Sequence, residues 1–131
     1  MEFYTRASGS SGNCSLGCAG DTLLLIDAGI SATRIKKALA AEGVDAADLD
    51  AVLITHEHSD HIAGLRTLTK WYQLPVYSRR ATLAQLPPEI PESLRREAAG
   101  AFRIAGVQIV PFSIPHDAAD PVGYRITGTR Q

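Results

Sequence analysis

Ala51-Val-Leu-Ile-Thr-His-Glu-His-Ser-Asp-His-Ile-Ala-Gly-Leu65 is the stretch on which the fold of this chain depends. It begins with an apolar run, residues 52–54, that predicts a buried strand. A cluster of polar residues follows at once, and Ile62 begins a helical pattern. The cluster is therefore expected on the loop between the carboxyl end of a strand and a helix, where open α/β sheets place their sites.

Four residues of this loop are of the types that bind metal ions: His56, His58, Asp60 and His61. Imidazole and carboxylate groups suit zinc, manganese and iron. Because side chains alternate in an extended segment, His56 and His58 project to the same side and can share one ion. Asp60 and His61 follow a turn and can point at a second ion. The alternative is a polar surface loop, but three of the four histidines of the chain lie here, which favours a metal site.

The run Thr55-His-Glu-His-Ser-Asp-His61 resembles the His-x-His-x-Asp-His signature of the metallo-β-lactamase fold hydrolases. The resemblance implies an α/β fold, an αββα sandwich with a two-metal site between the sheet edges. By that pattern, His56 and His58 bind the first metal, and Asp60 and His61 bind the second. Zinc is the expected metal, with manganese or iron as alternatives, and Asp60 is the candidate catalytic residue.

The small-residue loop Gly9-Ser-Ser-Gly-Asn13 is, by itself, typical of a flexible connector. In context it resembles the opening motif of one subgroup of this family, small cytoplasmic proteins similar to DNA exonucleases and phosphodiesterases. Tight loops of this kind bring backbone N–H groups and hydroxyls to anionic ligands. Ser10, Ser11 and Asn13 are therefore candidate substrate-binding residues.

Two further residues complete the expected site. His116 follows a predicted strand, and it is the histidine that remains to join His56 and His58. The stretch Ile114–Tyr124 also resembles a His-Asp-x-x-x-Pro-x-Gly-Tyr segment of the same subgroup, which implies His116 as a ligand of the first metal. Asp27 is either an ordinary turn residue or, as the resemblance implies, a carboxylate that supports the metal-binding loop without ligating a metal.

The bulk properties limit the function classes. The 131 residues, with 45% hydrophobic residues, predict one domain over residues 1–131. A net charge of −1 predicts no broad electrostatic grip on nucleic acid or lipid. We expect no membrane span and no signal peptide, and so a cytoplasmic protein. Cys14 and Cys18 are expected to be reduced structural thiols rather than a disulfide or half of a zinc site.

Local patterns predict the remaining elements. The stretch Ala7–Leu16 is expected to be a loop, and Trp71 is expected in the core. Helices are expected between Ser31 and Gly43, at 62–74 and at 92–99. Strands are expected at 2–6, 23–26, 52–54, 75–77, 101–104, 107–114 and 123–127.

Members of the family usually have roughly twice this length, still within the range of a single domain. In that pattern, the bridging aspartate and the last histidine lie beyond residue 131. The chain is therefore expected to match the first half of the fold. We expect the intact fold to hold two metal ions and this chain to hold one, because Asp60 and His61 alone make a poor second site. An uncovered sheet edge predicts a homodimer or a larger assembly.

These patterns predict that the intact protein is a metal-dependent hydrolase of phosphodiester bonds, acting on nucleic acid or a nucleotide through a hydroxide that bridges two metals. The 131-residue chain itself is expected to have little or no activity. A hydrolase of a thioester, lactone or lactam is one alternative, since the ligand motif is the same for these reactions. A non-enzymatic, metal-binding and self-associating module is another.

Overall fold

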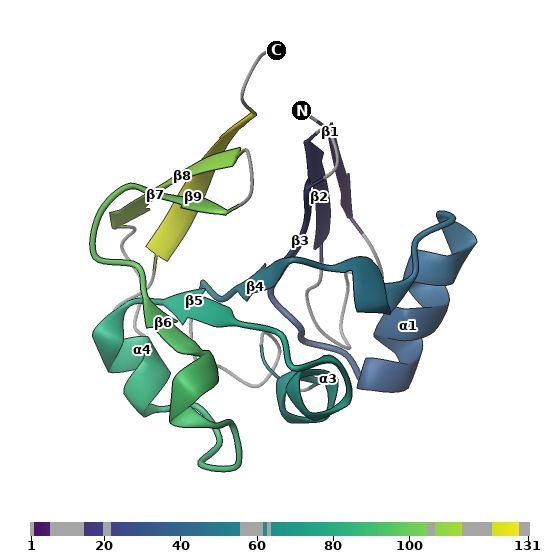
Figure 1. Ribbon diagram of the computed structural model, residues 1–131, viewed down its shortest axis with the longest axis horizontal. Helices are drawn as coiled ribbons and strands as arrows, with labels where there is room; N and C mark the ends of the chain where they lie inside the picture. The colour runs from purple at the N-terminus through teal and green to yellow at the C-terminus, as the bar shows by residue number, and fades with distance from the viewer. Residues whose placement is uncertain are drawn as a thin grey trace.

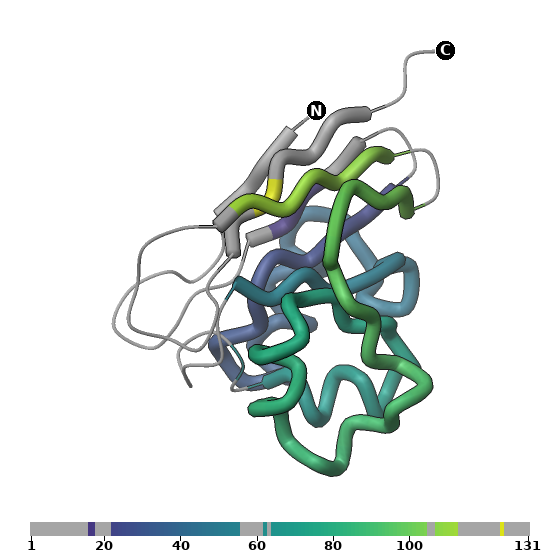
Figure 2. Tube along the Cα trace, turned by 90° about the vertical axis from the view of Figure 1, so that its left-hand side faces the viewer, coloured from purple at the N-terminus to yellow at the C-terminus, as the bar shows by residue number. Residues whose placement is uncertain are grey.

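The structure, a computed structural model, describes residues 2–5, 15–19, 22–55, 62, 64–104, 107–113 and 122–128. Within this part of the chain, a six-stranded and a three-stranded sheet face each other, and helices cover the outer side of the larger sheet (Figure 1). In the side view of Figure 2, β8 lies near the top of the molecule, and α3 and α4 lie toward the bottom.

The larger sheet has parallel strands on one side and antiparallel strands on the other. The first three strands pair antiparallel, and the third to the sixth pair parallel. Its strands are, in spatial order, β1 (Glu2–Thr5), β2 (Ser15–Ala19), β3 (Thr22–Ile26), β4 (Ala51–Leu53), β5 (Val76–Ser78) and β6 (Arg95–Glu97).

The smaller sheet is an antiparallel meander. Its strands are β7 (Phe102–Ile104), β8 (Val107–Ser113) and β9 (Val122–Gly128). The helices are α1 (Ala32–Ala41), η1 (Ala46–Asp48), α3 (Leu65–Tyr72), α4 (Arg80–Ala84) and η2 (Glu92–Leu94). None of the helices in the described ranges is both long and apolar enough to cross a membrane.

Strand β4 is buried on both faces, which explains its uninterrupted apolar sequence. Val52 and Ile54 point into the core between the sheet and the helices, where they join Ile35 and Leu68. Leu53 points into the second core, between the two sheets. Each fully buried side chain of this size contributes about 2 kcal/mol to folding, so β4 is fixed tightly in the middle of the structure.

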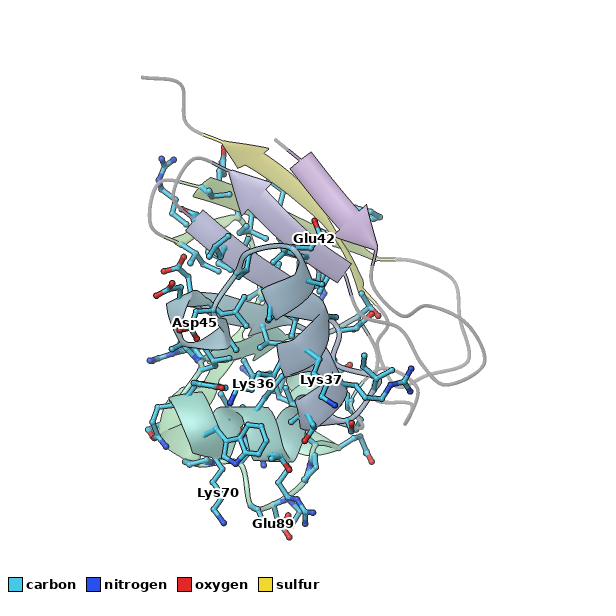
Figure 3. The ribbon with its side chains drawn as sticks, turned by 90° about the vertical axis from the view of Figure 1, so that its right-hand side faces the viewer. Lys36, Lys37, Glu42, Asp45, Lys70 and Glu89 are labelled. Atoms are coloured by element: carbon cyan, nitrogen blue, oxygen red, sulfur yellow. The ribbon has the colours of Figure 1, made fainter. Side chains whose placement is uncertain are left out.

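Helix α1 begins and ends as its sequence predicts. The Ser31 hydroxyl accepts a hydrogen bond from the N–H of Arg34 at 3.3 Å and caps the first turn. Gly43 follows the last turn with a φ of +77°, the left-handed conformation that favours glycine. Ile35 and Leu39 are buried, while Lys36 and Lys37 are exposed on the outer face, as Figure 3 shows.

Strand β2 was not predicted, because residues 15 and 16 fall in the stretch expected to be a loop. The strand is rich in small residues, which have low intrinsic strand propensity. It forms because it pairs with neighbours on both sides, and Leu16, opposite Leu25, is 1% exposed. Pairing and burial thus outweigh the local preference.

The prediction of a helix at 92–99 is wrong. A 3-10 turn, η2, is followed by β6, which pairs parallel with β5. The Arg95 guanidinium donates to the carbonyl oxygens of Pro87 at 2.7 Å and Ile90 at 3.2 Å. These bonds tie the segment to the preceding loop and favour the extended conformation.

Helix α3 is shorter than expected, and Trp71 is not in the core. The helix begins at Leu65 and ends at Tyr72, with Gln73 in the left-handed conformation. Leu65 and Leu68 are buried, whereas Trp71 is 47% exposed. The helical periodicity of the apolar residues was predicted correctly, but Trp71 lies at the edge of the apolar face of the helix.

Candidate metal centre

The predicted metal-binding loop follows directly from β4. The turn after β3 lies beside this point, because parallel strands end at the same edge of a sheet. The backbone N–H of Asp27 donates to the carbonyl oxygen of Leu53 at 2.8 Å. This bond places the Asp27 turn next to the two residues, Ile54 and Thr55, that lead into the loop.

Asp27 holds Thr55 with both carboxylate oxygens. Oδ1 accepts a hydrogen bond from the Thr55 backbone N–H, and Oδ2 accepts one from the Thr55 hydroxyl, each at 2.8 Å. The Asp27 side chain is buried, at 5% exposure, and the residue has a φ of +64°. Aspartate is among the few residues other than glycine that tolerate this conformation, and its geometry turns the carboxylate toward the start of the loop.

The far end of the loop is anchored to the same turn. The N–H of Gly64 donates to the carbonyl oxygen of Ala28 at 2.7 Å. A Cβ at position 64 would lie 2.2 Å from the carbonyl oxygen of Ile30, so the backbones touch at this point. Residues 27–30 therefore hold the loop at its first residue, Thr55, and at its last, Gly64.

A third contact holds the carbonyl oxygen of Ile54. It accepts hydrogen bonds from the Ser78 hydroxyl and the Tyr124 hydroxyl, both at 2.8 Å. Burial raises the pKa of Tyr124 above its ordinary value, so the phenol stays protonated and donates. The same hydroxyl lies 3.2 Å from the carbonyl oxygen of Tyr77, so its single proton is shared between the two acceptors.

The expected ligands themselves lie outside the described residues. This holds for the metal ligands His56, His58, Asp60, His61 and His116 and for the substrate-binding candidates Ser10, Ser11 and Asn13. Of the predicted site residues, Asp27 is described. Among the described side chains, no group of three or more His, Cys, Asp or Glu is placed to hold a metal.

The chemistry of the donor set nevertheless fits a divalent metal. The loop offers imidazoles and a carboxylate, the donors that zinc, manganese and iron prefer. Metal sites also need partners that orient their ligands. The hydrogen bonds at Thr55 and Gly64 attach both ends of the ligand-bearing loop to the turn after β3.

Two basic residues at the start of α4 contact the segment around β6. Arg79 donates to the carbonyl oxygen of Ala98 at 3.0 Å, and Arg80 lies 3.2 Å from a carboxylate oxygen of Glu97. Both contacts tie the start of α4 to the β6 segment.

A hollow of about 640 Å³ lies on the outer face of α3. It is lined by Arg66, Lys70, Trp71 and Glu89, among others, and an exposed ion pair joins Arg66 to Glu89 at 3.5 Å. Figure 3 shows Lys70 and Glu89 on this outer, helical side of the molecule. None of the residues that anchor the motif loop lines this hollow.

Two facing sheets, helices outside the larger one and a His- and Asp-rich loop at the end of its central parallel strand define an α/β protein of the metallo-β-lactamase fold. The chain belongs to the metallo-β-lactamase superfamily, which residues 7–130 match. The predicted family and fold class are thereby confirmed.

Curated relatives include the exodeoxyribonuclease YycJ of Bacillus anthracis, 34% identical over 95% of this chain and 49% of the relative. The exodeoxyribonuclease WalJ of Streptococcus pneumoniae (strain D39) is 36% identical over the same shares. A solved metallo-β-lactamase from Cronobacter sakazakii superposes with a TM-score of 0.76 at 21% identity, over 90% of this chain and 54% of that one. The chain spans about half the length of the curated relatives it matches, as expected.

Sequence reasoning missed Ser78 and gave Tyr124 no role. Tyr124 lies in a segment that resembles the family, but a tyrosine in a strand has many structural uses. Ser78 is the last residue of β5, and its short polar side chain beside an apolar run gave a weak signal. The contact of Ser78 with Ile54 depends on the pairing of β5 with β4, and that of Tyr124 depends on how the two sheets pack; no local pattern contains either.

Proposed function

We propose that the intact protein is a metal-dependent hydrolase of phosphodiester bonds in nucleic acid or a nucleotide. The observation that carries this proposal is the 34% and 36% identity to two exodeoxyribonucleases across 95% of the chain. The anchored loop after β4 supports it, because a hydrolytic metal site needs ligands held in fixed positions.

In this proposal His56, His58 and His116 hold the first ion, and Asp60 and His61 hold the second. Zinc is the expected metal. Bound ions would supply Lewis acidity toward a phosphoryl oxygen. Asp60 is the candidate catalytic residue, and Asp27 keeps the start of the loop in place through Thr55.

The proposal also covers the substrate contacts, the cellular location and the assembly of the protein. Ser10, Ser11 and Asn13 contact the substrate, which is nucleic acid or a nucleotide. The protein acts in the cytoplasm, and this chain associates into a dimer or a larger assembly. The net charge of −1 supports local rather than broad electrostatic contact with an anionic substrate.

The principal competing function is hydrolysis of a thioester, lactone or lactam. Similarity to the metallo-β-lactamase at 21% identity supports the fold and does not distinguish these substrates. The identities to exodeoxyribonucleases are higher, and they favour the phosphodiester.

A cleavage assay separates the candidates. The intact protein, purified and loaded with zinc or manganese, is mixed in excess with DNA oligonucleotides labelled at either end, and in parallel with a β-lactam and a thioester. We expect slow, metal-dependent release of nucleotides that His58→Ala abolishes. Turnover of the β-lactam or thioester without DNA cleavage would contradict the proposal, as would cleavage that survives His58→Ala.

A further inference from the structure

Three elements that are distant in the sequence meet at one backbone atom, the carbonyl oxygen of Ile54. Ile54 is 0% exposed and follows the last residue of β4. Its N–H continues the ladder to β5 by donating to the carbonyl oxygen of Tyr77 at 2.9 Å. Its carbonyl oxygen accepts two hydroxyl groups instead, from Ser78 on β5 and Tyr124 on β9.

Tyr124 reaches this atom from the other sheet. Its backbone pairs with Pro111 of β8, and its side chain packs against the core between the sheets. In Figure 1 β9 lies beside β4 and β5 across that core. Its hydroxyl lies 2.8 Å from the Ile54 oxygen and 3.2 Å from the Tyr77 oxygen. One phenol thus joins the smaller sheet to two neighbouring strands of the larger sheet.

The sequence on either side of these contacts connects them to the expected metal ligands. Ile54 is followed by Thr55 and then by the loop with His56 and His58. The connection from β8 to β9, residues 114–121, contains His116, and Tyr124 is the third residue of β9. The Tyr124–Ile54 bond therefore ties together the bases of the two segments that carry the three expected ligands of the first metal.

We propose that Tyr124 is a positioning residue that holds the two histidine-bearing segments at the spacing the first metal requires, and that Ser78 fixes the Ile54 carbonyl group that Tyr124 contacts. This inference rests on the proposed function, because it assigns the first metal to His56, His58 and His116. The tyrosine side chain has few rotatable bonds, and its hydroxyl lies within hydrogen-bond distance of two carbonyl oxygens, those of Ile54 and Tyr77. The side chain therefore limits the distance between the two sheets at this edge.

The competing explanation is a purely structural tie between the two sheets. The two explanations differ in one observable quantity. A structural tie changes the stability of the metal-free protein and leaves the affinity of the folded protein for zinc unchanged. A positioning residue lowers that affinity, because the ligands lose their prearranged spacing.

The test compares Tyr124→Phe and Ser78→Ala with the parent protein and with Tyr72→Phe. The last variant removes the same hydroxyl from a half-buried tyrosine that packs on the helical core instead. Zinc affinity is measured by competition with a chromophoric chelator, under conditions where circular dichroism shows each variant folded. Cobalt(II) absorption reports the ligand geometry independently of any hydrolysis.

We expect Tyr124→Phe to weaken zinc binding about 10-fold, in the range seen when partners of metal ligands are removed, and to alter the cobalt spectrum. Ser78→Ala is expected to act in the same direction, and Tyr72→Phe to bind like the parent. If Tyr124→Phe does not fold, the zinc affinity of Ser78→Ala alone tests the proposal. Parent-like affinity in both variants would overturn the positioning role while leaving the proposed function intact. A parent protein that binds no zinc would overturn both.

Discussion

Thr55 gives both of its donors to Asp27: its N–H and its hydroxyl each lie 2.8 Å from one carboxylate oxygen. Nine residues later, the N–H of Gly64 donates to the carbonyl oxygen of Ala28, the neighbour of Asp27. Both ends of the histidine-rich loop are therefore attached to one turn. The turn itself is joined to β4 by the bond from the Asp27 N–H to the Leu53 oxygen, so protein contacts hold both ends of the loop.

Asp27→Asn tests the first attachment. Asparagine tolerates the positive φ of this position, so the change removes the charge and replaces one acceptor by a donor that faces Thr55. We expect a loss of about 1–3 kcal/mol in the free energy of unfolding and a loss of about 10-fold or more in zinc affinity. Urea unfolding with chelator and zinc competition measure the two effects. Asp45→Asn is the control, since Asp45 caps η1 at an exposed position; equal losses in both variants would contradict the role of Asp27.

Gly64→Ala tests the second attachment. The φ of Gly64 is −96°, which alanine adopts freely, so the steric contact alone is at issue. The added Cβ would lie 2.2 Å from the Ile30 oxygen, and the backbone must move. We expect the protein to lose about 2 kcal/mol of stability or more. Gly100→Ala is the matched control, with nothing within 4 Å of its added Cβ, and a change within about 0.5 kcal/mol is expected there. Similar unfolding midpoints for the two variants would show that the close approach at Gly64 does not exist.

The buried Tyr124 hydroxyl predicts a dependence of stability on alkaline pH. Burial raises the pKa of Tyr124 above the ordinary value of 10.0, so the folded state keeps a proton that the unfolded state has released. The folded state then binds more protons, and stability falls as the pH rises above that value. Above about pH 10, where the unfolded state loses the tyrosine proton, the stability of the parent should fall more steeply with pH than that of Tyr124→Phe. Urea unfolding at several pH values measures the slopes, with Tyr72→Phe as control. Equal slopes for the parent and Tyr124→Phe would refute the burial of an intact phenol.

Much of the fold followed from the sequence because its signals are local. The apolar run of β4, the Ser31 cap and the parallel order of β4, α3 and β5 were all predicted correctly. The two missed strands share a cause. Strand β2 and strand β6 form because neighbouring strands pair with them, and residues 15–19 and 95–97 carry no strong propensity of their own.

The candidate site was predictable to a different degree. The ligand types and their spacing came from the motif, and those assignments stay predictions, because the ligands lie outside the described residues. The carboxylate of Asp27 was expected to support the loop, and the structure provides its contacts with Thr55. The convergence of Ser78 and Tyr124 on Ile54 depends on strand pairing within one sheet and on packing between the two sheets, so no local sequence pattern could reveal it.

A further prediction is that the chain associates with itself. Phe112 on β8 is 48% exposed, and the terminal strands of each sheet have one neighbour among the described strands. Exposed edges and apolar side chains favour pairing with a second copy. We expect light scattering at micromolar concentration to give at least twice the 14.0 kDa mass of one chain.

Two variants locate the contact. Phe112→Lys should shift the assembly toward the monomer, while Trp71→Lys, which changes the outer face of α3, should not. A parent protein that is monomeric at every concentration would contradict self-association, and an equal effect of both variants would contradict the assignment to the smaller sheet.

The most direct test of the account is a zinc titration of the parent and His58→Ala by chelator competition, with elemental analysis of the purified protein. With His56, His58 and His116 on the first ion, and Asp60 and His61 alone for a second, we predict about one tightly held ion per chain. Removal of one ligand should weaken its binding by at least about 10-fold. Parent-like affinity of His58→Ala would contradict the metal site at the exit of β4, and so would a parent protein that binds no zinc.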